Sequence, residues 1–233
     1  MLAAILRDAG RQYRGRPLAV VLTLALELAA LPLDEAGDAI QGAAGILLLV
    51  VAILVELFLV AYLAGALSPT PSPAGEAVTA ARRAVGPGVR GMLLLYLYVA
   101  VAFLIAMLLF GGDQGTPLSS GEQRNFLVGA APLVAVAFAF VAVLSQRVVL
   151  DGERRALRAA AASHRVAAAH FPICLLIGVL QALGLTLGAF DPGGFLAVVV
   201  AVGLGLLDPF PVAMSNSLYL QTRSLIDSGG SPR

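Results

Sequence analysis

Three carboxylates lie inside long apolar stretches of the chain, where ionisable groups are unusual. They are Glu27, Glu56 and Asp208. An ionisable group at the middle of a bilayer costs about 2.5–3.5 kcal/mol on insertion scales, so each is a candidate for proton- or cation-linked function. The alternative is that each carboxyl is protonated, or hydrogen-bonded within a helical bundle. Because no arginine falls at the same depth, the protonated form is favoured.

Asp208 differs from the other two because it opens the run Asp208-Pro209-Phe210-Pro211. Pro209 and Pro211 remove two backbone donors and are expected to break or kink the helix. Discontinuous helices often form transporter sites. A kink that only lets the last helix leave the bundle and pack explains the pattern equally well.

The remaining reactive residues do not form a site by their spacing. His164, His170 and Cys174 are too few for a metal, which needs three or four ligands. His170 is better interpreted as an interfacial polar residue. No nucleophile–base pattern or cofactor-binding motif occurs in a usable context. We therefore expect no catalytic residue, no metal, no cofactor and no enzymatic activity.

Composition indicates a protein that lives in lipid. Of 233 residues, 59% are hydrophobic and 12% are charged, and the mean hydropathy is +0.92. Soluble domains average about 45–50% apolar and about 25% charged residues. All fifteen basic residues are arginine, so chemistry that needs a lysine amine is excluded. Their placement at membrane boundaries gives no support for nucleic-acid binding.

Six stretches are long enough to cross the hydrocarbon as helices, which takes about 20 residues each. They predict an all-α, polytopic membrane protein with one six-span domain over residues 1–233. The predicted spans are Pro17–Leu33, Gly45–Ser68, Met92–Phe110, Phe126–Val149, Phe171–Phe190 and Phe195–Leu220.

The arginines predict the orientation of these spans. Fourteen lie before the first span, between the second and third, from the end of the fourth to the start of the fifth, or after the sixth, and Arg124 alone lies on the opposite side. Basic residues stay on the cytoplasmic side of a membrane. Both termini are therefore expected in the cytoplasm.

The basic segments 1–16, 75–90 and 153–169 carry apolar stripes at helical spacing, which is typical of helices lying flat at the membrane surface. The run Gly86–Gly88 is expected to end the second of these helices early. Their arginines are predicted to meet anionic lipid headgroups on the cytoplasmic face. These residues are Arg11, Arg14, Arg82, Arg83, Arg154, Arg155, Arg158 and Arg165.

A basic helix followed by a helical hairpin recurs along the chain, which suggests a threefold repeat over residues 1–68, 75–149 and 153–221. Within the last unit, Gly184 and Gly188 form a Gly-x-x-x-Gly pattern. Small residues at this spacing allow two membrane helices to approach closely, so we interpret the pair as a packing site.

Short motifs from Val148 to Leu175 and at the chain end carry a family resemblance. The motifs are Val148-Val149-Leu150-Asp151-Gly152, Ser163-His164-Arg165, Phe171, and Leu218-Tyr219 with Arg223. They resemble the membrane domain attached to some glycerophosphoryl diester phosphodiesterases and its stand-alone YciC-like bacterial relatives. The resemblance implies a six-span protein of the bacterial cytoplasmic (inner) membrane. The phosphodiesterase chemistry belongs to a separate soluble domain, so no catalytic residue carries over.

Two functions remain open at this point. The first is a non-catalytic membrane component that binds lipids, a membrane-protein partner or further copies of itself, with an accessory or organising role. The second is a small permease or channel that uses the intramembrane carboxylates. Their convergence on one cavity would favour the second.

Overall fold

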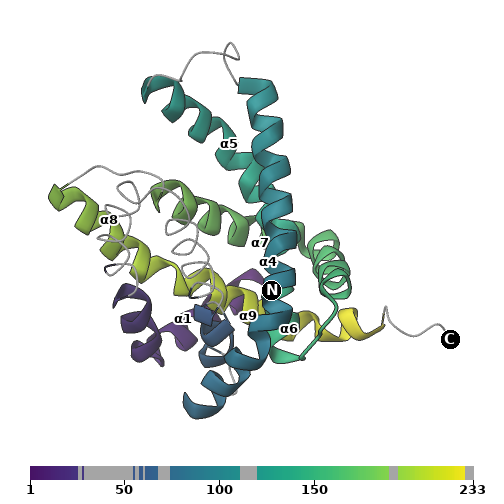
Figure 1. Ribbon diagram of the computed structural model, residues 1–233. Helices are drawn as coiled ribbons and strands as arrows, with labels where there is room; N and C mark the ends of the chain where they lie inside the picture. Colours follow the sequence, from purple (N-terminus) through teal and green to yellow (C-terminus); the bar gives the residue numbers. More distant parts are fainter. Residues whose placement is uncertain are drawn as a thin grey trace.

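The computed structural model describes residues 1–25, 28, 55, 58–59, 61–67, 74–110, 120–188 and 194–228. Within them the structure is helical and contains no strand, so the predicted all-α class is confirmed. Figure 1 shows the arrangement of the labelled helices. These are α1 (Leu2–Arg14), α4 (Ala74–Phe110), α5 (Ser120–Phe140), α6 (Leu144–Leu150), α7 (Ala156–Gly188), α8 (Gly194–Leu207) and α9 (Pro209–Ser228).

Four helical segments of the described chain are long and apolar enough to cross a membrane. They are Val89–Leu109, Gly129–Val148, Ala156–Gly184 and Val198–Ser224. These overlap the third to sixth predicted spans. The first predicted span is described as helix from Pro17 to Ala25 and at Leu28, and its last part lies outside the described residues, as does most of the second. The fifth differs most from its prediction, because its helix begins at Ala156 and so includes the segment expected to lie flat at the surface.

Helix α7 is bent at His170, whose backbone angles (φ −135°, ψ 38°) leave the helical range. Pro172 lies two residues later and cannot donate a backbone hydrogen bond, which explains why the helix changes direction there. A basic segment, 156–169, and an apolar segment, 171–188, therefore join at a kink.

Helix α4, by contrast, continues through Gly86–Gly88 without a break. The expectation that this run ends a surface helix is wrong. One proline removes a single helical hydrogen bond, and the turns on either side can hold the helix together across it.

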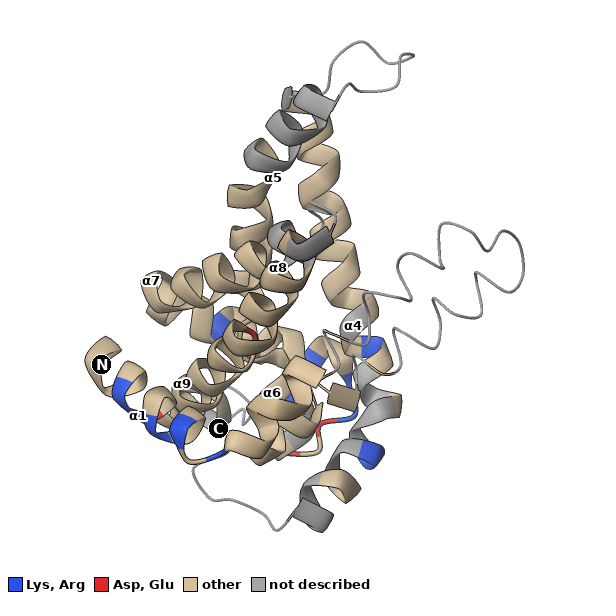
Figure 2. Ribbon diagram, turned by 90° about the vertical axis from the view of Figure 1, so that its left-hand side faces the viewer, with Lys and Arg blue, Asp and Glu red and all other residues tan. Residues whose placement is uncertain are grey.

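The α4–α5 hairpin projects from the rest of the described chain, as both ribbon views show (Figures 1 and 2). Its outer helix is little covered: the span Val89–Leu109 is 12% buried, against 56% for Gly129–Val148. Apolar side chains such as Leu93, Leu97 and Leu108 are exposed on α4. In a membrane this surface would face lipid chains.

The tightest helix contact joins α5 to α7 at Gly178. A Cβ atom at Gly178 would clash with the carbonyl oxygen of Ala135 and would lie 2.9 Å from the backbone nitrogen of Ala139. Ala182, one turn further along α7, is also buried. Small residues on both helices therefore let the two backbones touch.

Both return helices of the described chain are interrupted. Residues 141–143 form a turn between α5 and α6, and Asp208 forms the turn between α8 and α9. The units 75–149 and 153–221 thus share a long helix followed by a helix in two pieces. The threefold repeat stays a prediction, because most of the hairpin of the unit 1–68 lies outside the described residues.

Candidate functional site

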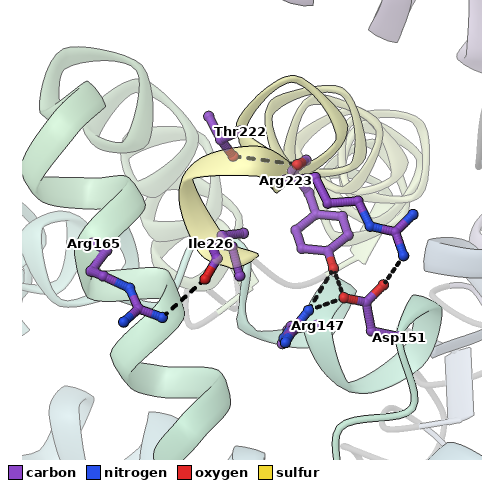
Figure 3. Close-up of polar contacts among 7 residues, drawn as sticks. Arg147, Asp151, Arg165, Thr222, Arg223 and Ile226 are labelled. Atoms are coloured by element: carbon purple, nitrogen blue, oxygen red, sulfur yellow. Dashed lines mark hydrogen bonds and ion pairs between the residues drawn. The ribbon is translucent and has the colours of Figure 1, made fainter. Parts of the chain in front are cut away.

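A network of charged and hydroxyl groups surrounds Asp151 at the end of α6 (Figure 3). Arg147 and the Tyr219 hydroxyl both donate to Asp151 Oδ2. Arg223 Nη2 lies 3.1 Å from Asp151 Oδ1. Arg147 Nη1 also donates to the Tyr219 hydroxyl oxygen at 3.4 Å. We name these four residues the Asp151 network.

Burial gives the members of the Asp151 network different roles. The Asp151 side chain is 10% exposed and that of Arg223 is 55% exposed, while Tyr219 is fully buried. The carboxylate accepts hydrogen bonds from one guanidinium group and a phenol and forms an ion pair with a second guanidinium group, so its charge is compensated inside the protein. The network joins the end of the fourth span to the last helix.

The backbone around Asp151 explains why this carboxylate can turn inward. Gly152 has φ +68°, a left-handed conformation that residues with a side chain rarely adopt. Asp151-Gly152 and Tyr219 with Arg223 are also motifs on which the family resemblance depends, and here they lie together. Arg147, which completes the network, was not singled out from the sequence. Its i, i+4 spacing to Asp151 on one helical turn was the available signal.

The arginines predicted to meet lipid headgroups are all exposed. In Figure 2 the arginines drawn in blue lie in the lower half of the view, and some of them belong to the lower part of α4 itself. We name this region the arginine end. Arg11 pairs with Asp8 at 2.7 Å on the surface of α1. Exposed leucines stand beside these charges, and Leu157 is 76% exposed.

The intramembrane carboxylates are only partly placed. Glu27 and Glu56 lie outside the described residues. Asp208 is half-buried between α8 and α9, and a Cβ atom at Gly184 of α7 would lie 3.0 Å from its Oδ1 atom. The missing side chain at Gly184 therefore leaves space for the Asp208 carboxylate beside α7. The packing around Gly188 lies outside what the structure describes.

Two buried polar side chains bond to backbone groups at the ends and breaks of helices: Ser163, which belongs to one of the sequence motifs, and Asn216, which the sequence did not single out. Ser163 Oγ accepts from the backbone nitrogen of Val143, 3.3 Å away, in the turn between α5 and α6. Asn216 Nδ2 donates to the carbonyl oxygen of Ala64 at 2.9 Å. Because the bilayer core offers no water, open backbone groups must find such partners within the protein.

Other buried oxygens have no hydrogen-bond partner in the part of the chain that the structure describes. They are Gln12 Oε1, Gln181 Oε1, Ser215 Oγ and Asn216 Oδ1. The Gln12 amide nitrogen, in contrast, donates to Ser217 Oγ at 3.0 Å. Buried polar atoms in proteins are usually hydrogen-bonded, so these four oxygens are exceptions within the described chain.

The histidine and cysteine residues occupy structural positions. His164 Nε2 lies 2.7 Å from the Tyr98 hydroxyl, and its ring packs edge-on against Phe140. Cys174 is buried. Among the described residues, no group of three His, Cys, Asp or Glu side chains could hold a metal ion.

Comparison with known proteins identifies no relative: no family model, no curated protein and no solved structure matches the chain.

Proposed function

We propose that this chain is a non-catalytic integral membrane protein that binds lipids or a membrane-protein partner as an accessory or organising component of a bacterial cytoplasmic membrane. The observation that carries the proposal is the arginine end, where exposed arginines stand beside exposed leucines. Exposed leucines suit the apolar chains of lipids, and exposed arginines suit their anionic headgroups.

Helix α1 supports this function most clearly, because its three sides differ. Ile5 and Ala9 are fully buried against the bundle. Leu2 and Leu6 are exposed and follow a neighbouring stripe. The arginines of α1 occupy the remaining side, by helical periodicity. A helix at the boundary between a bundle, lipid chains and headgroups needs these three sides.

The orientation with both termini in the cytoplasm belongs to the same proposal. It is supported by the arginine bias of the sequence and by the gathering of the described arginines at one end (Figure 2). The YciC-like resemblance supports the bacterial inner membrane and six spans.

The test is the thermal stability of the purified chain in mild detergent with added lipid. Phosphatidylglycerol should raise Tm more than phosphatidylcholine does, and added salt should reduce the difference, because headgroup attraction is electrostatic. Replacing Arg154, Arg155 and Arg158 together by Gln should remove the difference, whereas Lys at the same positions should retain it. Equal stabilisation by the two lipids would contradict the proposal.

A small permease or channel is the second candidate. The observation in its favour is Asp208, which lies at an interruption of a membrane-spanning helix. Glu27 and Glu56 lie outside the described residues. The exposed arginines beside exposed leucines favour the lipid- or partner-binding function.

A further inference from the structure

Two candidate spans end at the Asp151 network. The segment Gly129–Val148 ends just before Asp151, and Val198–Ser224 ends just after Arg223. The network therefore lies where the apolar parts of two helices give way to more polar chain. In a membrane this is the depth of the phospholipid headgroups, where an arginine can meet anionic groups without entering the hydrocarbon.

Arg223 is the member of the network whose charge is the least compensated. One carboxylate cannot neutralise two guanidinium groups, and Asp151 already accepts from Arg147 at Oδ2. Arg223 Nη2 lies 3.1 Å from the other oxygen, and the Arg223 side chain is 55% exposed. A guanidinium carries several N–H donors in a planar fork. In the part of the chain that the structure describes, those of Arg223 have no acceptor other than Asp151.

Asp151 holds the Arg223 guanidinium from the side of the protein (Figure 3). The carboxylate is itself fixed by hydrogen bonds from Arg147 and Tyr219. An arginine that is already held in place loses less side-chain freedom when it binds a ligand than an unrestrained one does. The planar fork of a guanidinium matches two oxygens of a phosphate group. Arg223 is therefore prepared for a phosphate.

The surface beside Arg223 also suits an acyl chain. Leu220 is 38% exposed and lies one turn before Arg223, at the spacing that places two side chains on one face of a helix. The opposite side of this helix is buried and carries Tyr219, Thr222 and Ile226. Leu220 lies toward the apolar part of the span and Arg223 toward its end, which is the order of the chains and the headgroup in a phospholipid.

We propose that Arg223 forms a binding site for the phosphodiester of an anionic phospholipid, in which Asp151 positions the guanidinium and Leu220 contacts an acyl chain. The inference rests on the proposed function and names one specific site within it. Arg223 lies outside the basic segments 1–16, 75–90 and 153–169, so the sequence did not assign it this role. A monoanionic headgroup balances the positive charge that Asp151 leaves over, whereas the ammonium of phosphatidylcholine would add another beside it.

The experiment titrates dihexanoyl phosphatidylglycerol, a soluble short-chain lipid, into the full chain at a fixed concentration of neutral detergent in phosphate-free buffer. Calorimetry should show one saturable site per chain. Arg223→Gln should weaken the affinity by about tenfold or more, as expected for a lost hydrogen bond between charged groups. Arg223→Lys should lie between Arg223→Gln and the wild type, because an ammonium keeps the charge without the fork.

Arg11→Gln is the matched control. Arg11 also pairs with an aspartate, Asp8 at 2.7 Å, but this pair lies on an open surface. Its removal should change the affinity by less than about twofold. Glycerol 3-phosphate and inorganic phosphate distinguish a lipid from a free phosphate. Both should bind at least about tenfold more weakly than the lipid, because they gain nothing from Leu220.

The outcomes separate this site from the proposed function. If the wild type prefers phosphatidylglycerol over phosphatidylcholine, but Arg223→Gln and Arg11→Gln weaken binding equally, the proposed function stands and the Arg223 site is refuted. Absence of that preference in the wild type refutes both. Inorganic phosphate that binds as tightly as the lipid shows a site for free phosphate and overturns the assignment to a phospholipid.

Discussion

At the scale of single residues, the Asp151 network shows how a charge can be held near a membrane surface. Asp151 receives donors from its own helix and from α9, far away in sequence. Such a network stabilises only while it is complete, because removing one partner leaves another charge partly buried without compensation. The buried members should therefore matter much more than the exposed one.

We predict a fixed order of destabilisation within this network. Asp151→Asn should cost about 3–5 kcal/mol, since it removes the one charged acceptor shared by Arg147, Tyr219 and Arg223. Tyr219→Phe should cost about 1.5–3 kcal/mol, the range for a hydrogen bond to a charged group. Arg223→Gln, at a half-exposed position, should cost less than about 1 kcal/mol. Unfolding titrations in mixed micelles measure all three; a cost for Arg223→Gln equal to that for Asp151→Asn would refute this account.

At the scale of helices, close approach between α5 and α7 depends on one glycine. Gly178 touches the backbone of α5 near Ala135 and Ala139, whereas Gly184, predicted as a packing residue, faces Asp208. The sequence pattern correctly identified α7 as the helix that carries the packing glycines. It did not show which side of that helix meets α5, because side-chain spacing alone does not specify the partner of each face.

We predict that Gly178→Ala destabilises the fold by about 1–3 kcal/mol, the range for overpacking in a tight interface. The added methyl group would meet backbone atoms, which cannot move aside as a flexible side chain could. Gly203→Ala is the control, because a Cβ atom there meets nothing within 4 Å. It should leave stability unchanged or raise it by about 0.4–1 kcal/mol. Thermal unfolding in detergent distinguishes the two variants, and equal Tm changes would count against the α5–α7 contact.

At the scale of the whole molecule, apolar runs and arginine placement predicted the helical class and four of the spans now seen as candidates. They did not predict how the surface segments connect to the spans. Helix α4 continues through Gly86–Gly88 without a break, and α7 bends at His170 without ending there. The Asp151 network was also beyond prediction, since Tyr219 lies 68 positions from Asp151. Long-range polar pairing depends on tertiary packing that helical periodicity does not encode.

The central claim at this scale is that the arginine end prefers anionic lipid. One introduced tryptophan can report this preference by its fluorescence, because the chain contains no other tryptophan. Leu157→Trp would place a single emitter on an exposed position beside Arg154, Arg155 and Arg158. In vesicles containing a brominated lipid at fixed mole fraction, brominated phosphatidylglycerol should quench this emission more than brominated phosphatidylcholine. Gln at the three arginine positions should make the two lipids equal, and Lys should preserve the preference. Equal quenching by the two lipids in the Leu157→Trp protein would contradict the account.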